Sequence, residues 1–238
     1  RKMSLYFKDT KSPFYGFIFT IPLFLIYELG IVINSNESII SMRNGADVLL
    51  RQILSFLGLN GIYWLGFIFF VAYIITFFIH KNKTKQQEIN NVYLFIMIIE
   101  SLFWASLIYI FMSNIHLLLM NPTGSIILQR VTLAIGAGIY EEFLFRVLLI
   151  LLLSQILKFI FKWSYKFSRL ASMIISAGIF SSFHFLGEYG DYFSFNVFMI
   201  RFFAGIFLGM IYFTRGFGIV AWSHSIYDLI VLTKITTN

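Results

Sequence analysis

Residues 138–153 read G-I-Y-E-E-F-L-F-R-V-L-L-I-L-L-L, which places two glutamates and an arginine in an otherwise apolar run. A charged side chain at the centre of a membrane helix costs about 2.5–3.5 kcal/mol on insertion scales. Residues four apart share one helix face, so Glu142 and Arg146 can form an ion pair. Glu141 lies about 100° away around the helix, and the residue four positions later is Phe145. Glu141 therefore needs a partner from another helix, or else desolvation keeps it protonated. A buried carboxylate of this kind suits a general base.

Three later apolar segments carry polar or small residues at helical spacing. These are F-S-S-F-H with Phe180 and His184, F-F-A-G-I-F-L-G with Gly205 and Gly209, and H-S-I-Y-D with His224 and Asp228. A histidine and an aspartate four residues apart can hydrogen-bond within one helix, which orients the imidazole ring. Two glycines at this spacing allow close helix packing, and Phe180, Gly205 and Gly209 are expected to serve packing. Each motif alone is more often structural than catalytic, so the indication of an active site comes from the ordered set.

That ordered set, E-E-x-x-x-R, F-x-x-x-H, F-x-x-G-x-x-x-G and H-x-x-x-D, resembles the CPBP (CAAX protease and bacteriocin-processing, or Abi) family. Its members are glutamate-type intramembrane proteases, among them the type 2 CAAX prenyl endopeptidases. The resemblance covers about 140–230, somewhat under half of the chain. The roles that it implies are water activation by Glu141 and His184, site shaping or substrate binding by Glu142 and Arg146, and oxyanion stabilisation by His224 and Asp228. It thus implies an intramembrane endopeptidase that cuts near the terminus of a membrane-associated or lipid-linked protein or peptide.

Asp228 departs from the CAAX-cleaving members of the family, which have asparagine at this position. An ionised aspartate cannot donate a hydrogen bond to an oxyanion. Either Asp228 is protonated, or it orients and charges His224, which then donates; the second interpretation is favoured. Zinc is the alternative to metal-free chemistry, with Glu141, His184, His224 and Asp228 as ligands. Because H-E-x-x-H is absent, metal-free glutamate chemistry without a cofactor is expected.

The composition is that of a membrane protein. The 238 residues are 59% hydrophobic and 12% charged, with a mean hydropathy of +0.83, whereas soluble domains carry about 25% charged residues. Apolar runs of about 20 residues recur, which is long enough to cross a bilayer. The fold class predicted is all-α, a polytopic transmembrane helical bundle in a bacterial inner (cytoplasmic) membrane. The absence of cysteine excludes disulfides and a cysteine nucleophile.

The net charge of +7 comes from cations in short loops between apolar segments. That distribution is typical of the cytoplasmic loops of membrane proteins and does not require a nucleic-acid partner. The expected partners are the membrane lipid bilayer and a protein or peptide substrate, lipidated or not.

Seven membrane-spanning helices are predicted, at roughly 14–34, 62–80, 91–119, 128–157, 171–187, 195–214 and 217–233. Basic residues concentrate in 1–11, 81–85 and 158–169, whereas the alternate loops hold few. The positive-inside rule then predicts a cytoplasmic N-terminus. The first three spans form an N-terminal membrane region, 1–125, and the last four a catalytic core, 126–238.

Local signals refine the first of these regions. Pro13 suits a helix start, and Pro22 predicts a kink in the first span. Asn44 is predicted to cap a short helix, Ala46–Leu57. On that helix the polar residues Asp47, Arg51 and Ser55 lie on one side and Leu50, Ile53, Leu54 and Leu57 on the other. This pattern favours a helix lying in the membrane interface.

Three further charges lie inside predicted spans. Glu28 and Glu100 are expected to be structural, paired with Arg201 or with hydroxyls. Arg201 is expected either to reach towards the external face or to complete the polar cluster of the site.

Two other classes of function compete with the protease. A non-enzymatic bacteriocin-immunity or membrane-interaction protein could keep the same motifs without a reaction. A proton-coupled transporter also uses buried glutamate and histidine, but the sequence shows no repeated half and no matched pair of interrupted helices. G-x-S-x-G and G-x-G-D are absent, so serine and aspartyl intramembrane proteases lack their usual motifs.

Overall fold

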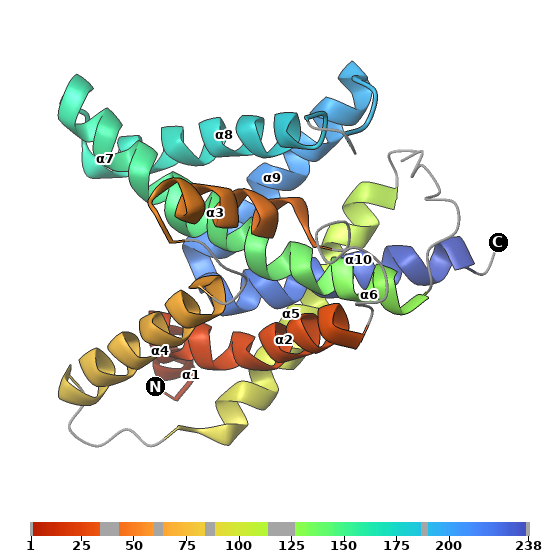
Figure 1. The fold of residues 1–238 in the computed structure, drawn as a ribbon. Helices are drawn as coiled ribbons and strands as arrows, with labels where there is room; N and C mark the ends of the chain where they lie inside the picture. Colours follow the sequence, from red (N-terminus) through yellow and green to blue (C-terminus); the bar gives the residue numbers. More distant parts are fainter. Residues whose placement is uncertain are drawn as a thin grey trace.

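The computed structural model describes residues 2–33, 43–59, 64–83, 89–113, 127–186 and 190–236 (Figure 1). Within these ranges the chain is almost entirely helical and contains no strand, which confirms the predicted all-α fold. The helices are α1 (Lys2–Thr10), α2 (Pro13–Ile33), α3 (Gly45–Phe56), α4 (Trp64–Lys83), α5 (Asn91–Ser113), α6 (Ile127–Gly136), α7 (Ile150–Phe161), α8 (Tyr165–Phe183), α9 (Phe195–Arg215) and α10 (Phe217–Thr236). Two π-helical segments, η1 (Ala137–Glu141) and η2 (Phe143–Leu149), connect α6 to α7.

Four helical segments in the described ranges are long and apolar enough to cross a membrane. They are α2, α5 over Asn91–Met112, the continuous segment Ile127–Phe161, and α9. The apolar part of α10, Phe217–Leu232, is shorter. These segments make the chain an integral membrane protein, while the seven-span count and the cytoplasmic N-terminus stay predictions.

Two of the predicted spans, 62–80 and 171–187, correspond to α4 and α8 but are not among these four helices. Helix α8 begins at Tyr165, well before the predicted start, because Ser164 caps it by accepting a hydrogen bond from the Phe167 backbone N–H. It carries four buried serines, Ser168, Ser172, Ser176 and Ser181, which lower its hydropathy. It also ends earlier than predicted, at Phe183.

The N-terminal region contains a helix that the sequence pattern did not predict. Helix α1 lies where the sequence indicated only a basic tail, and it precedes α2, which starts at Pro13 as predicted. Pro22 lies inside α2 and the helix continues to Ile33, so the predicted kink stays a prediction. The boundary between the predicted regions 1–125 and 126–238 falls outside the described residues.

Helix α3 confirms the predicted cap, while its predicted place in the membrane interface stays a prediction. The Asn44 side chain accepts a hydrogen bond from the Ala46 backbone N–H, as expected of an N-cap. Asp47 from the polar side and Leu50 from the apolar side are both buried, whereas Ser55 and Phe56 near the end of the helix are exposed. Burial of this carboxylate is possible because it accepts hydrogen bonds from Arg43, Arg51 and Tyr27.

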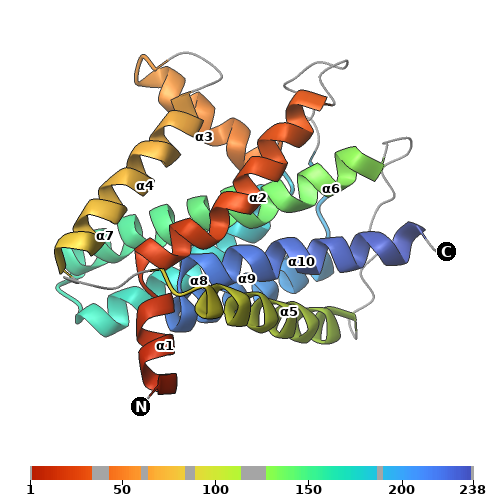
Figure 2. The same ribbon diagram turned by 90° about the horizontal axis from the view of Figure 1, so that it is seen from below.

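Helix α10 forms the centre of the bundle. It packs against α2, α5, α6, α9 and η1, and Figure 2 shows α5 and α6 on either side of it. The close contact between η1 and α10 depends on Gly138, because a Cβ there would lie 2.3 Å from the Ala221 carbonyl oxygen and 2.1 Å from Ser225 Oγ. The π-helical segment therefore lies directly against the helix that carries His224 and Asp228.

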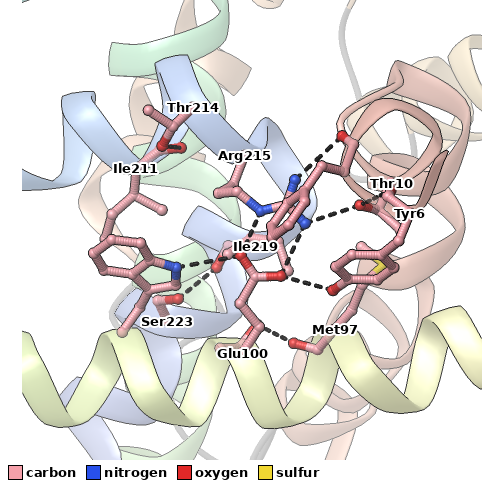
Figure 3. A network of polar contacts seen from close by, with 12 residues as sticks. Tyr6, Thr10, Met97, Glu100, Ile211, Thr214, Arg215, Ile219 and Ser223 are labelled. Carbon is pink, nitrogen blue, oxygen red and sulfur yellow. Dashed lines mark hydrogen bonds and ion pairs between the residues drawn. The ribbon is translucent and has the colours of Figure 1, made fainter. Parts of the chain in front are cut away.

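A buried polar network on the α5 side of α10 joins α1, α5 and α9 (Figure 3). Glu100 pairs with Arg215 and accepts a hydrogen bond of 2.6 Å from the Tyr6 hydroxyl. Arg215 also donates to Thr10 Oγ1 and to the Phe7 carbonyl. Burial, with Glu100 beside it, raises the pKa of the Tyr6 hydroxyl, which keeps that group a donor. Of the two kinds of partner predicted for Glu100, the hydroxyl contact is present, but the arginine is Arg215 and not Arg201.

Candidate active site

The two adjacent glutamates lie where the helix is wider than an α-helix. Glu141 is the last residue of η1, and Arg146 lies in η2. A π-helix bonds i to i+5, and such segments occur frequently at functional sites. The predicted helix 128–157 was assumed to be α-helical throughout, which the structure corrects. Glu141 is 7% exposed and Glu142 is fully buried, so both carboxylates lie inside the bundle.

Glu142 contacts an arginine and a histidine from different helical segments. Its Oε2 lies 3.1 Å from Arg146 Nε, the ion pair expected from their spacing. Its Oε1 lies 2.8 Å from Nδ1 of His224 on α10, a contact between residues 82 apart in sequence. Glu142 therefore connects the π-helical segment to α10.

The second contact changes the interpretation of Asp228. The expected hydrogen bond within the H-x-x-x-D motif is not formed, because His224 Nε2 lies 3.7 Å from Asp228 Oδ2. The carboxylate that orients the imidazole through a hydrogen bond is Glu142. Asp228 is an ion-pair neighbour of the other ring nitrogen, and its predicted role of orienting and charging His224 stays a prediction.

Glu141 has a partner that the sequence did not indicate. Its Oε1 accepts a hydrogen bond of 2.9 Å from Asn44 Nδ2, and this contact is buried. Asn44 was predicted only as a helix cap, and no local pattern connects residues 97 apart. Glu141 also lies within electrostatic range of His184.

His184 follows the last residue of α8 and is held by its own helix. Its Nδ1 lies 2.9 Å from the Phe180 carbonyl oxygen. A carbonyl can only accept, so Nδ1 carries the hydrogen, and Nε2 of a neutral ring is an acceptor. The His184 ring also packs edge-on against Phe180, with centroids 4.9 Å apart. His184 thus offers a free ring nitrogen beside Glu141.

Packing around Phe180 holds these groups together. Its ring contacts His224 edge-on, and the Arg146 guanidinium lies 4.4 Å from its centroid. A Cβ on Gly205 would lie 3.2 Å from the Phe180 ring and 3.1 Å from Ala177. A Cβ on Gly209 would lie 2.6 Å from Met173 Cγ. The two glycines therefore bring α9 close to α8, and the Gly205 carbonyl accepts a hydrogen bond from Arg146.

Arg201 and Glu28 lie at the edges of this cluster and do not contact each other as predicted. Arg201 pairs with Asp191, whose backbone N–H donates to the His184 carbonyl at 3.0 Å. Glu28 accepts a hydrogen bond from the Tyr140 hydroxyl. Glu28 also forms ion pairs with Arg43 and Arg51, the two arginines that hold Asp47. Arg201 is within electrostatic reach of His184, which places it next to the site.

The arrangement suits acid–base chemistry. Glu141 supplies a buried carboxylate within electrostatic range of His184, and His184 and His224 each hold Nδ1 in a contact that leaves Nε2 for a further partner. Among the described residues, which include all four predicted zinc ligands, no group of three or more His, Asp or Glu side chains is arranged to hold a metal ion. The metal-free chemistry expected from the sequence stays a prediction.

Comparison with known proteins bears on the same part of the chain. Residues 122–230 match the protein-family model described as type II CAAX prenyl endopeptidase Rce1-like. No curated protein and no solved structure matches the chain. The matched segment runs from α6 into α10 and contains every residue of the four sequence motifs. This confirms the predicted resemblance: residues 122–230 carry the sequence pattern of the Rce1-like, type II CAAX prenyl endopeptidases, a family of proteases.

Proposed function

We propose that this protein is an intramembrane endopeptidase that hydrolyses a peptide bond near the C-terminus of a membrane-associated, prenylated protein. The observation that carries the proposal is the buried hydrogen bond between Glu142 and His224, next to Glu141 in the chain and with the His184 ring packed on Phe180, whose ring also contacts His224. Glu142 is engaged in orienting the His224 imidazole, whereas Glu141 accepts one hydrogen bond from a neutral amide and is left for a water molecule. The substrate class is drawn from the family that residues 122–230 match.

In the proposed reaction a water molecule is held between Glu141 and Nε2 of His184. Glu141 takes a proton as the water oxygen bonds to the carbonyl carbon of the substrate. The tetrahedral oxyanion then accepts a hydrogen bond from His224 Nε2–H, whose positive charge is supported by Glu142 and Asp228. When the C–N bond breaks, the proton passes to the leaving amine, and the products are a new carboxylate and a short peptide.

Cleavage of a farnesylated peptide ending in a CAAX sequence, with products identified by mass spectrometry, tests this proposal. In purified, reconstituted protein, Glu141→Gln should lower kcat by about 10²–10⁴, the usual contribution of a general base. The thermal stability should stay close to wild type, because the amide oxygen can still accept from Asn44. Full activity in a folded Glu141→Gln protein contradicts the assignment.

The same assay separates the competing classes of function. A cellular phenotype that survives Glu141→Ala and His184→Ala, together with no cleavage by wild type, favours the non-enzymatic immunity or interaction protein. Substrate-dependent proton flux in liposomes without cleavage favours the transporter.

We also propose that the chemistry needs no metal ion. Metal analysis of active, purified protein should find no stoichiometric zinc, and a chelator should leave kcat unchanged. Stoichiometric zinc that is lost together with activity contradicts this part of the proposal and returns Glu141, His184, His224 and Asp228 to the role of ligands.

A further inference from the structure

Asn44 lies outside the segment that matches the protease family, yet it makes a buried contact with the proposed general base. Its side-chain amide makes two hydrogen bonds. Oδ1 accepts from the Ala46 backbone N–H at 2.9 Å, and Nδ2 donates to Glu141 Oε1 at 2.9 Å. A backbone N–H can only donate, so the cap fixes which end of the amide faces Glu141. Because the cap uses Oδ1, the Nδ2 donor of Asn44 is directed at the Glu141 carboxylate.

Asn44 is itself held in place. Its backbone N–H donates to the Tyr27 hydroxyl, which donates in turn to Asp47. The end of α6 approaches closely on the other side, since a Cβ on Gly136 would lie 3.2 Å from Asn44 Cβ and 2.3 Å from the Tyr27 ring. The start of α3 is thus locked between α2 and the helix that leads into Glu141.

We propose that Asn44 is a positioning residue for the proposed protease reaction: it anchors Oε1 of Glu141 so that Oε2 is directed at the water. This inference rests on the proposed function, and it gives the N-terminal region a part in the site. A carboxylate that rotates freely is in the productive orientation for only part of the time. When one oxygen is anchored, the other has a defined position.

Glu141 is surrounded by other charged groups that any test must keep unchanged. From its own segment Arg146 interacts with it, from α8 His184, and from α10 His224 and Asp228. Asn44 is the neutral donor that α3 adds to this set. Substitution of Asn44 alone therefore changes one hydrogen bond to the carboxylate without removing a charge.

Asn44→Ser and Asn44→Asp make the test, because serine and aspartate are both good helix N-caps. The serine is too short to reach Glu141, so kcat should fall about 10- to 100-fold with KM unchanged, the loss expected for one hydrogen bond to a charged group. The aspartate places a second carboxylate against Glu141, so kcat should fall further. Like charge favours the protonated form of a base, so the acidic side of the pH–activity profile should move to higher pH.

Asn90 provides a matched control. Its Oδ1 accepts from the Val92 backbone N–H at 3.0 Å, and its own N–H donates to the Tyr15 hydroxyl, the same capping arrangement at the start of α5. Asn90→Ser and Asn90→Asp should keep wild-type kcat and pH dependence. If the Asn90 variants lose as much kcat as the Asn44 variants, the effect belongs to capping and the inference is wrong.

Two outcomes separate this inference from the proposed function. If Glu141→Gln is inactive but Asn44→Asp keeps the wild-type kcat and pH profile, the positioning role is overturned and the protease assignment stands. If Glu141→Gln is fully active, the proposed function itself fails. The position of the acidic limb does not depend on how much protein is folded, so it decides the question even for a destabilised variant.

Discussion

Two buried glutamate–arginine pairs, on either side of α10, use their hydrogen-bonding groups differently. Both carboxylate oxygens of Glu100 accept hydrogen bonds, from Arg215, Tyr6 and Trp104. Arg215 also donates hydrogen bonds to Thr10 Oγ1 and to the Phe7 carbonyl oxygen. In the pair formed by Glu142 and Arg146, by contrast, Glu142 Oε2 and Arg146 Nη1 are buried without a hydrogen-bond partner.

The difference separates a structural network from a candidate site. A buried polar group without a partner costs about 1–3 kcal/mol, so folded proteins satisfy nearly all of them. The Glu100–Arg215 network follows this rule and links three helices. The Glu142–Arg146 pair breaks the rule next to Glu141 and His184, where spare donors and acceptors can serve a substrate. We call the Glu142–Arg146 pair the open network and the Glu100–Arg215 network the closed one. The open network also lies within the segment that matches a protease family, whereas Glu100 lies outside it.

Replacing a glutamate by glutamine should lower activity but not stability at the candidate site, and stability but not activity in the Glu100–Arg215 network. The loss of kcat at Glu141 is the largest effect that we expect. Glu141→Gln should lower kcat by about 10²–10⁴ with little change in thermal stability. Glu100→Gln leaves Arg215 buried without its counterion, so the free energy of unfolding should fall by about 3–5 kcal/mol. Peptide cleavage and thermal unfolding in the same detergent measure both quantities.

The kcat per folded molecule of Glu100→Gln should stay close to wild type. A folded Glu100→Gln protein that cannot cleave the peptide would contradict the structural role of the Glu100–Arg215 network, because that network would then take part in catalysis.

Arg215→Lys tests the Glu100–Arg215 network from its other side and should lower the free energy of unfolding by less than Glu100→Gln. Lysine keeps the charge but cannot reproduce the planar guanidinium that binds Glu100, Thr10 and Phe7 together. Loss of a hydrogen bond to a charged group should lower the free energy of unfolding by about 1.5–3 kcal/mol. Arg169→Lys is the control, since Arg169 packs on the rings of Tyr165 and Phe213, and such contacts contribute about 0.5–1 kcal/mol. Equal losses in the two variants would argue that the Arg215 network adds nothing beyond ring packing.

The contacts that could be predicted from the sequence are local ones. The Glu142–Arg146 pair and the Asn44 cap follow from helical spacing and from a cap preference, and both are present. The hydrogen bonds of Glu141 to Asn44 and of Glu142 to His224 join residues 97 and 82 positions apart. They depend on how the helices pack, which spacing along one helix does not determine.

The wrong partners have a common cause. Arg201 or hydroxyls were the partners expected for Glu28 and Glu100, and both glutamates do accept from a tyrosine hydroxyl. Arg201 was considered because it lies inside a predicted span. Of the arginines that reach them, Arg43 lies before α3 and Arg215 is the last residue of α9, whereas Arg51 lies within α3. Long side chains extend inwards from such positions, so a position at a helix end does not exclude a buried ion pair.

Asp228→Asn should have the smallest effect of these substitutions. Asp228 is an ion-pair neighbour at 3.7 Å, and its side chain is 29% exposed. No hydrogen bond joins the pair, and partly exposed ion pairs contribute about 0.2–1 kcal/mol, so kcat should fall by less than about tenfold. His224 keeps its hydrogen bond to Glu142 and loses only one of two anionic neighbours, so the basic side of the pH–activity profile should move to lower pH. An Asp228→Asn protein as inactive as Glu141→Gln would show that Asp228 itself acts on the substrate, and that the open network extends along α10 beyond His224.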